Sequence, residues 1–295
     1  MNKQIIALGF FDGVHLGHKA LLHACRDLAV ATGCDTAAAL TFDTHPEALV
    51  RGKAPGLINT QADRLGLIHA CGIHPVYLLH FDEAMRTMPW QEFLRLLLER
   101  YNAAGIVCGH DFRFGYRGEG TAEKLQAVCR DAGIPCTVVG EQTLDGLRVS
   151  SSHIRTLLEQ GRVEEVNRFL GHTHILTGTV VPGKQLGRTI GVPTANLLLP
   201  PELAVPRFGV YACVIGIDGT DYAAVTNIGT RPTVNGQGVT VESWILDFQG
   251  DLYGRELTLN FFAFLRPERK FDSLEQLQAE IQKNAVQARK ILGFS

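Results

Sequence analysis

Two histidines that are three residues apart could bind phosphate near the start of the chain. They belong to the stretch Gly9-Phe10-Phe11-Asp12-Gly13-Val14-His15-Leu16-Gly17-His18. An apolar run at residues 5–8 precedes this stretch and a helical pattern follows it, which predicts a strand, a tight turn and a helix. The N–H groups at the helix start and both imidazoles could donate to phosphate oxygens, while Gly13 and Gly17 would admit a ligand close to the backbone. The alternative is a surface turn with two solvated histidines.

Further polar and aromatic clusters follow later strand patterns. Residues 41–46 and residues 109–115 each combine aromatic and polar side chains that could hold a flavin or adenine ring, or that simply pack a loop. A serine run at residues 150–152 precedes a helical pattern that contains Arg155. Such a run caps a helix and leaves N–H groups for an anion that Arg155 could also reach, although a plain helix cap is the alternative.

The second half of the chain carries its own candidate phosphate loop at residues 183–196. The loop combines glycines, two cations, a hydroxyl and a side-chain amide, which could wrap a nucleotide phosphate and place Thr194 and Asn196 on a magnesium ion. A glycine-rich connection between strands is the alternative. Residues 227–233 and 241–244 follow, and Glu242 is either a solvated charge on a strand or a general base.

The pattern of elements predicts two domains in the 295 residues. Strand patterns at 5–8, 37–42, 76–79, 105–108 and 136–139 alternate with helical patterns at 18–31, 60–71, 91–101, 121–132 and 151–160. This alternation predicts a Rossmann-like α/β domain with a parallel sheet, at residues 1–172, whose ligands lie at the carboxyl ends of the strands. Strand patterns at 175–181, 209–217, 222–228, 239–247 and 256–264, with one helical pattern at 273–292, predict a small antiparallel β-barrel with a C-terminal helix, at residues 173–295.

Composition narrows the class of partner. The formal charge of −2 gives no basic field for nucleic acid or an acidic membrane, so we expect small-molecule partners. The expected form is a monomer or a weak homo-oligomer. We expect no signal peptide, because the short apolar run near the start is interrupted at Asp12, and no apolar run is long enough to cross a membrane. The seven cysteines contain no C-x-x-C pair, so neither a disulfide framework nor a zinc site is expected and the predicted location is the cytoplasm.

These motifs carry a resemblance to a known family. The first stretch resembles the HxGH signature of the nucleotidylyltransferase superfamily, in the form found in the bacterial bifunctional riboflavin kinase/FAD synthetase family. Residues 150–155 resemble the second signature of that superfamily, Ser-Ser-Thr-x-Ile-Arg, with Ser152 in place of threonine. Residues 191–196 resemble the G-x-P-T-A-N motif of riboflavin kinase, with Val192 where phenylalanine is common. The resemblance covers nearly the whole chain.

The resemblance implies two reactions and a set of residues for them. A nucleotidylyltransferase domain would transfer an adenylyl group from ATP to FMN, and the barrel would phosphorylate riboflavin with ATP, in both cases with Mg²⁺. The catalytic candidates are His15, His18, Arg155 and, as the base of the kinase, Glu242. The candidates for binding ATP and its phosphates are Gly9, Phe10, Asp12, Gly13, Gly17, Ser151, Ser152, Gly183, Lys184, Gly187 and Arg188. The candidates for binding flavin are Asp43, His45, Pro46, Asp111, Phe112, Arg113, Phe114, Arg266 and Phe271, and those for the metal are Thr194 and Asn196.

Two other functions are compatible with parts of this pattern. A nucleotidylyltransferase of other specificity, with a barrel that only binds a ligand, would release pyrophosphate without phosphorylating riboflavin. A regulatory module would bind flavin without turnover. Asn284 stands where the family often has aspartate, and we assign it no role.

Overall fold

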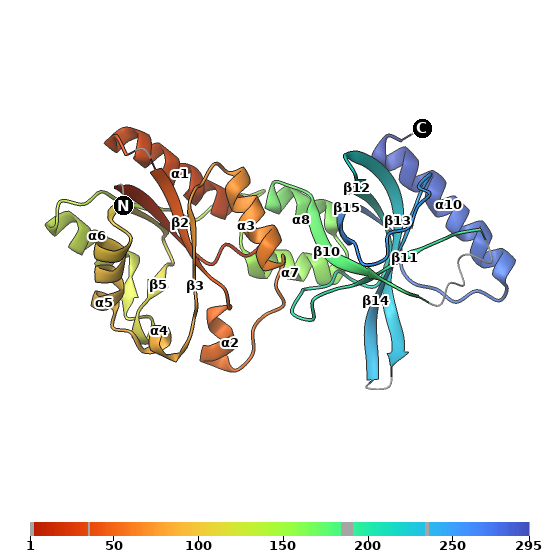
Figure 1. Ribbon diagram of the computed structural model, residues 1–295, viewed down its shortest axis with the longest axis horizontal. Coiled ribbons are helices and arrows are strands. Elements are labelled where there is room, and N and C mark those ends of the chain that lie inside the picture. Colours follow the sequence, from red (N-terminus) through yellow and green to blue (C-terminus); the bar gives the residue numbers. More distant parts are fainter. Residues whose placement is uncertain (1–2, 35, 184–190, 234–235, 295) are drawn as a thin grey trace. The chain divides into compact units, whose positions relative to one another are not determined.

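The computed structural model describes residues 3–34, 36–183, 191–233 and 236–294. The chain divides into two compact units, Met1–Ser151 and Ser152–Ser295 (Figure 1). The first unit is built around an open sheet with helices, and the second contains a barrel and a long terminal helix. These architectures confirm the predicted fold class.

The sheet of the first unit is entirely parallel. Its strand order is β3-β2-β1-β4-β7. The strands are β1 (Gln4–Leu8), β2 (Thr36–Phe42), β3 (Val76–Leu79), β4 (Ala103–Gly109) and β7 (Cys136–Val139). The order reverses between β1 and β4, because the chain first builds outward through β2 and β3 and then returns to the other side of β1. A crevice for ligands opens at the carboxyl ends of the strands at such a switch point, so the turn after β1 is favourably placed.

Each face of this sheet is covered by helices because β1 is apolar on both sides. Ile5 and Ala7 lie in a core with α1 (Leu16–Thr32), and Ile6 and Leu8 lie in a second core on the opposite face. The other elements of the unit are α2 (Pro46–Arg51), α3 (Gln61–Ala70), α4 (Glu83–Thr87), α5 (Trp90–Arg95), η1 (Leu96–Arg100), β5 (Arg113–Phe114), η2 (Tyr116–Gly118), β6 (Gly120–Thr121), α6 (Ala122–Asp131), β8 (Thr143–Leu144) and β9 (Leu147–Arg148).

The second unit contains a closed antiparallel barrel in the order β10-β11-β14-β13-β12-β15. Its strands are β10 (His174–Val181), β11 (Ala195–Leu198), β12 (Gly209–Ile217), β13 (Thr220–Thr233), β14 (Gly236–Ile245) and β15 (Glu256–Arg266). The terminal helix α10 (Leu274–Leu292) packs Ala285 and Ala288 against small apolar residues of the barrel wall, among them Ala212 and Ala263. Small residues on both sides let the helix lie close to the strands.

Two helices, α7 (Ser151–Gln160) and α8 (Val163–Leu170), connect the sheet to the barrel. The amide of Asn167 in α8 donates to the carbonyl of Phe261 at 2.8 Å and accepts the backbone N–H of His174 at 2.7 Å. These two bonds tie α8 to the barrel strands β15 and β10. The structural units divide after Ser151, the first residue of α7, whereas the domain boundary after residue 172 remains a prediction.

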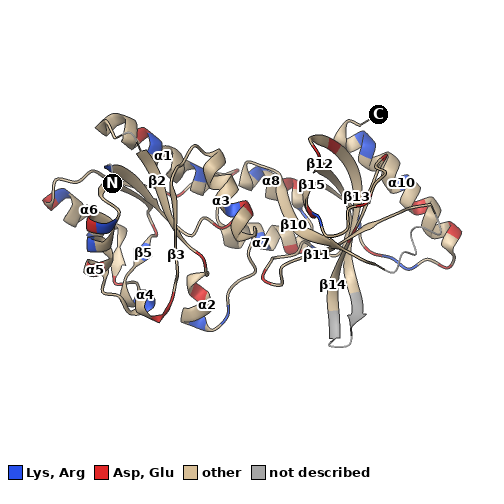
Figure 2. Cartoon of the chain, viewed as in Figure 1, with Lys and Arg blue, Asp and Glu red and all other residues tan. Residues whose placement is uncertain are grey.

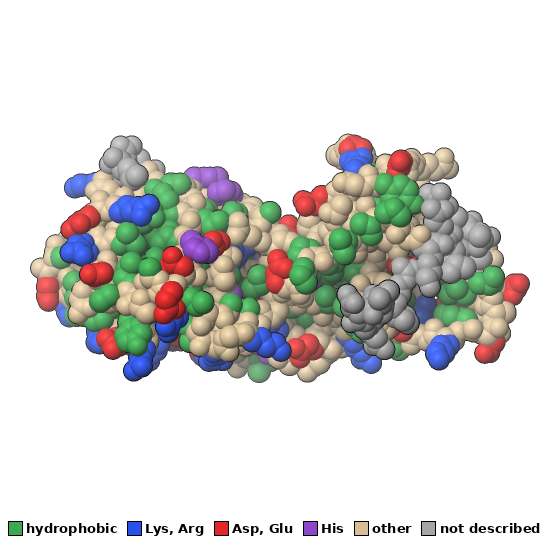
Figure 3. All heavy atoms as spheres, turned by 60° about the horizontal axis from the view of Figure 1, so that its bottom comes forward, with side chains coloured by type: hydrophobic (Ala, Val, Ile, Leu, Met, Phe, Trp, Pro, Cys, Tyr) green, Lys and Arg blue, Asp and Glu red, His purple; other side chains and the backbone are tan. Residues whose placement is uncertain are grey.

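Charged residues of both signs are interspersed over the described elements (Figure 2). On the face shown in Figure 3, acidic and basic side chains alternate among apolar ones. None of the described helices is both long enough and apolar enough to span a bilayer.

Candidate active sites

The turn after β1 has a strained backbone that the core holds in place. Phe11, Gly13 and Val14 have positive φ angles of 61°, 81° and 39°. Such angles are unfavourable for residues with a side chain, and they persist where the surrounding structure fixes them. Phe11 and Val14 are fully buried in the core shared by β1 and α1, so apolar burial holds the turn in this shape.

His15 and His18 lie together at the start of α1. His15 caps the helix, since its Nδ1 accepts the backbone N–H of His18 at 3.2 Å, and the two rings stack with centroids 3.7 Å apart. A Cβ on Gly17 would come within 3.1 Å of His15 Cε1, so glycine leaves room for this arrangement. Because Nδ1 of His15 is an acceptor, the proton of its neutral ring is on Nε2, the nitrogen that can donate to a phosphate.

The pKa of His18 is held well below its usual value by burial, and the neighbouring His15 and Arg64 lower it further. Its Nδ1 is buried and has no hydrogen-bond partner among the described residues. His18 is therefore neutral near pH 7, and it offers phosphate a hydrogen bond rather than positive charge. The charge that offsets bound phosphates must come from other side chains.

Asp12 joins this turn to two distant segments. Its Oδ1 accepts the backbone N–H of Ile58 at 2.9 Å, and its carbonyl accepts the hydroxyl of Ser151 at 2.9 Å. The structure thus brings the first residue of α7 to the histidine turn, as the two sequence signatures predict. Ser152 and Arg155 lie further along α7, in the second unit, and their contacts with phosphate remain predictions.

Four of the predicted flavin residues line an apolar cavity of about 230 Å³ in the first unit. They are Pro46, Phe112, Arg113 and Phe114. The rings of Phe112 and Phe114 stack with centroids 5.4 Å apart, and Phe42 at the end of β2 forms another part of the wall. This lining suits a flat aromatic ligand.

The other three predicted flavin residues of this unit do not line that cavity. Asp43 accepts a hydrogen bond from His80 at 2.7 Å, and this bond raises the pKa of His80. His45 caps α2 and its ring lies 4.5 Å from that of Phe10. Asp111 forms an ion pair with Arg148. Their side chains hold loops at the edge of the sheet, and direct contact with flavin stays a prediction.

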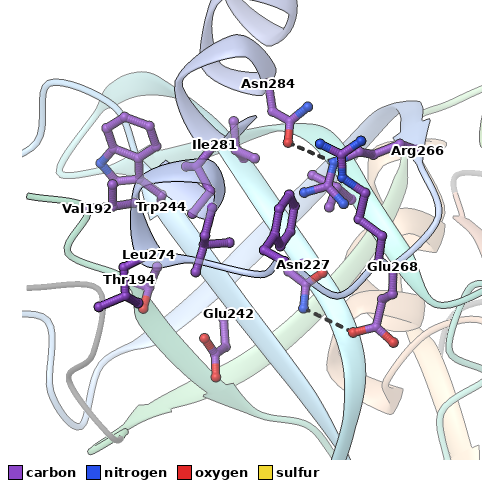
Figure 4. Close-up of a pocket in the computed structure, with 15 residues that line it drawn as sticks. Val192, Thr194, Asn227, Glu242, Trp244, Arg266, Glu268, Leu274, Ile281 and Asn284 are labelled. Carbon is purple, nitrogen blue, oxygen red and sulfur yellow. Dashed lines mark hydrogen bonds between the residues drawn. The ribbon is translucent and has the colours of Figure 1, made fainter. Parts of the chain in front are cut away.

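In the barrel, Glu242 lies between two asparagines on neighbouring strands. It pairs with Asn196 of β11 on one side and with Asn227 of β13 on the other. Residues paired across antiparallel strands project from the same face, so the three side chains share one surface. Glu242, Asn227 and Thr194 line a cavity of about 440 Å³ between the barrel wall and α10, as Figure 4 shows.

The opposite wall of this cavity contains Arg266 and Phe271. The guanidinium groups of Arg266 and Arg269 lie 5.6 Å and 4.7 Å from the centre of the Phe271 ring. Arg266 donates from Nε to the buried Asn284 of α10 at 3.1 Å and lies 3.5 Å from Glu280 (Figure 4). Burial lowers the pKa of Arg266, but the group stays charged near neutral pH.

The candidate phosphate loop is described only at its two ends. A Cβ on Gly183 would come within 2.3 to 2.6 Å of the amide atoms of Asn196, so glycine leaves room for this side chain in its present position. Lys184, Gly187 and Arg188 lie outside the described residues. Their predicted contacts with phosphate remain predictions.

Comparisons with known proteins match both halves of the chain. A family model described as FAD synthetase matches residues 1–153, and one described as riboflavin kinase matches residues 170–292. A bifunctional riboflavin kinase/FMN adenylyltransferase from Listeria monocytogenes is 34% identical over 97% of this chain and 92% of its own length. The corresponding protein of Escherichia coli K12 is 34% identical over 99% and 93%. The chain belongs to this bifunctional family.

A solved structure has the same fold along the chain. It is a Streptococcus pneumoniae protein named as a macrolide-efflux protein, with a TM-score of 0.89 and 30% identity, covering 98% of this chain and 94% of its own. The efflux name belongs to that protein alone, whereas the family models and curated relatives name flavin enzymes. Membership in the bifunctional riboflavin kinase/FMN adenylyltransferase family confirms both predicted activities and their order along the chain.

Sequence reasoning left three residues of these sites without a role. The sequence patterns place Asn227 in a motif without a role of its own, and they assign no role to Asn284 or Arg64. A signal for Asn284 existed, because it follows Leu277 and Ile281 at helical spacing and is thus a polar residue on the apolar face of α10. Arg64 gave no such signal, because one arginine in an amphipathic helix usually points to solvent.

Proposed function

We propose that the two activities of the family are carried out at the two sites described above. Riboflavin is phosphorylated to FMN at the barrel cavity, and FMN is adenylylated to FAD at the turn after β1. The observation that carries this assignment is Glu242, which faces a cavity beside α10 and stands in register between Asn196 and Asn227.

In the kinase step, Glu242 is the base. The terminal hydroxyl oxygen of riboflavin attacks the γ-phosphorus of ATP, the bond to the bridging oxygen of ADP breaks, and the hydroxyl proton passes to the Glu242 carboxylate. Two asparagine amides beside the carboxylate can hold the hydroxyl and a phosphate oxygen in line. Positioning of this kind supplies most of the rate in phosphoryl transfer.

The flavin ring occupies the apolar part of the same cavity. Val210 and Val225 of the barrel wall face Leu277 and Ile281 of α10, and Phe271 closes one side. A cavity of about 440 Å³ falls within the usual range of roughly 300–1,000 Å³ for small-molecule sites. Arg266, held by Asn284, places a fixed cation beside the polar edge of the ring.

The residues near Glu242 suit Mg²⁺. The Thr194 hydroxyl and the Asn196 amide oxygen are hard oxygen donors, which magnesium prefers, and the close approach of Gly183 fixes the Asn196 side chain. When bound with ATP, the metal supplies positive charge that offsets the phosphates. The protein contributes the two side chains and leaves the remaining positions to phosphate and water.

In the adenylyl step, the FMN phosphate attacks directly. A phosphate oxygen of FMN bonds to the α-phosphorus of ATP and the bond to pyrophosphate breaks, with no need for a base because the phosphate is already ionised near neutral pH. Nε2–H of His15 and the N–H groups at the start of α1 hold the ATP phosphates. His18, Ser151 and Arg155 complete the proposed contacts.

The proposed setting is the cytoplasm, with riboflavin, FMN and ATP as the partners. The seven cysteines form no disulfide, which fits a reducing compartment. The proposed working form is a monomer or a weak homo-oligomer.

One set of assays tests the assignment. The purified chain is given riboflavin, ATP and Mg²⁺, and FMN, FAD and pyrophosphate are quantified. Wild type should form both flavins, whereas Glu242→Gln should form FMN at least about 100-fold more slowly yet convert supplied FMN to FAD at the wild-type rate. A nucleotidylyltransferase of other specificity would release pyrophosphate but leave riboflavin unphosphorylated, and a regulatory module would bind flavin without forming product. Normal FMN formation by Glu242→Gln would remove the base assignment.

A further inference from the structure

The segment at residues 58–64 lies directly against the histidine turn. The backbone N–H of Ile58 donates to Asp12 Oδ1 at 2.9 Å, and the guanidinium of Arg64 lies 4.0 Å from the centre of the Phe10 ring. Asp12 and Phe10 both belong to the turn after β1. The start of α3 therefore forms a wall of the proposed adenylyl-transfer site that no sequence motif marks.

Asn59 in this segment is buried without hydrogen-bond partners. Its side chain is 2% exposed, and neither Oδ1 nor Nδ2 has a partner among the described residues. Buried amides are almost always paired, because an unpaired one loses its bonds to water and gains nothing in return. This amide follows Ile58, whose N–H binds the turn, and it is available to a partner that arrives with the substrate.

Arg64 is a buried cation with few bonds of its own. It is 2% exposed, donates from Nη2 to the carbonyl of Phe42 at 2.7 Å, and leaves Nε without a partner among the described residues. No described carboxylate forms an ion pair with it. Burial lowers the pKa of Arg64 to about 10, against the opposing fields of Asp12 and Asp43, so it stays charged at pH 7.

The Arg64 guanidinium lies between the two parts of the proposed adenylyl-transfer site, the histidine turn and the apolar cavity. Phe10 belongs to the turn that holds ATP phosphates, and Phe42 forms part of the apolar cavity that suits the flavin ring. The phosphate of a bound FMN must lie between that cavity and that turn, because it has to reach the α-phosphorus of ATP. Since His18 is neutral, a cation is needed there, and Arg64 contacts both sides.

We propose that Asn59 and Arg64 are the residues that select and position the phosphomonoester of FMN. The Asn59 amide donates to a phosphate oxygen, and the Arg64 guanidinium supplies the fixed charge and orients Phe10. The side chains thereby distinguish FMN from riboflavin, which lacks this phosphate. The proposal rests on the function proposed above for the first unit.

The decisive variant is Asn59→Leu, which replaces the amide by an apolar group of similar size. Because the amide has no partner in the fold, the variant should unfold at the same temperature as wild type or higher. Its kcat/KM for FMN in FAD formation should fall at least tenfold through a higher KM for FMN, with the KM for ATP unchanged. Gln61→Leu, at an exposed position in the same segment, is the matched control and should behave as wild type.

Arg64 is tested by a pair of variants that separates charge from packing. In Arg64→Gln the rate of FAD formation from FMN should fall at least tenfold. In Arg64→Lys the rate should fall less, because the cation is kept. Phosphorylation of riboflavin by the same preparations should stay at the wild-type rate.

Opposite results would overturn the assignment. They are an unchanged KM for FMN in Asn59→Leu, equal loss in Arg64→Lys and Arg64→Gln, or an Asn59→Leu protein that does not fold, since an unpartnered amide adds no bond to the fold. Failure of wild type to form FAD from FMN would instead reject the proposed function.

Discussion

Asn196 and Glu242 are direct partners across β11 and β14, so their side chains leave the same face of the barrel. Their proposed roles differ, and the kinase reaction should separate them. Asn196→Ala should raise the Mg²⁺ concentration needed for half-maximal FMN formation by about tenfold, because one oxygen donor is lost. Glu242→Gln should leave that concentration unchanged and lower kcat by about 100-fold or more, since the base is lost. Magnesium titrations of both variants check this, and a shifted titration in Glu242→Gln would contradict it.

We predict that replacing Gly183 lowers kinase activity as much as replacing Asn196, the residue beside it. In Gly183→Ala the new Cβ would fall within 2.3 to 2.6 Å of the Asn196 amide, which must move. The variant should therefore reproduce the magnesium defect of Asn196→Ala while FAD formation from FMN is retained. Gly140→Ala is the control, because no atom lies within 4 Å of a Cβ there. A Gly183→Ala enzyme with a normal magnesium requirement would show that Asn196 does not hold the metal.

Gly17→Ala, in the first unit, should change helix stability and activity in opposite directions. Gly17 lies in the first turn of α1, where alanine favours the helix by roughly 1 kcal/mol over glycine. The added Cβ would nevertheless lie 3.1 Å from His15 Cε1, so the ring that stacks on His18 would have to shift by a few tenths of an ångström. We expect FAD formation to fall about tenfold with no loss of thermal stability. Assays of FAD formation and thermal unfolding on the same sample test both parts, and undiminished FAD formation would argue against a role for the His15 geometry.

The sequence predicted those parts of the molecule that depend on neighbouring residues. The turn after β1 is local, since apolar residues, glycines and a helical pattern follow one another, and its predicted place at the carboxyl end of β1 is confirmed. Local patterns also predicted the parallel sheet and the barrel. They missed α2 and α4, which are too short to show a helical period, and β11, whose first two residues fall in the predicted loop at 183–196.

Local sequence patterns did not predict contacts between distant segments. The stacking of Arg64 on Phe10 depends on how α3 docks against the first turn, which no local pattern encodes. The register that places Asn227 beside Glu242 likewise requires the pairing of β13 with β14. His45 follows β2, a strand that the sequence predicts. It also caps α2, a helix that the sequence does not predict, so the position of His45 relative to the flavin cavity could not be inferred.

Asn284 should control how the kinase binds flavin. It accepts Nε–H of Arg266 at 3.1 Å and is 3% exposed, so it fixes the guanidinium beside Phe271. In Asn284→Leu the Nε–H of Arg266 loses this acceptor and keeps only Glu280 at 3.5 Å, so we expect the KM for riboflavin to rise about tenfold with a smaller change in kcat. Asn284→Asp restores an acceptor and should stay within about threefold of wild type. Equal behaviour of the two variants would mean that the bond to Arg266 does not position the flavin.

His174 should make the stability of the barrel depend on pH. It is fully buried beside Phe261 and neither ring nitrogen has a partner among the described residues. Burial, with a smaller effect of His172, lowers its pKa from 6.5 to about 3. Between these values the unfolded chain binds a proton that the folded barrel does not, so stability is full above pH 6.5 and falls as the pH drops, by about 1.4 kcal/mol per unit.

The fluorescence of Trp244 can follow this effect in a Trp90→Phe background, because each unit contains one of the two tryptophans. Urea unfolding at pH 7 and pH 5 should differ by about 2 kcal/mol from this one group. His174→Leu removes the titrating ring and should reduce the difference by that amount, while His69→Leu, exposed in the first unit, should leave it unchanged. The unfolding free energy of His174→Leu could instead keep the full difference between pH 7 and pH 5. In that case burial of His174 would not be the cause of the acid sensitivity of the barrel.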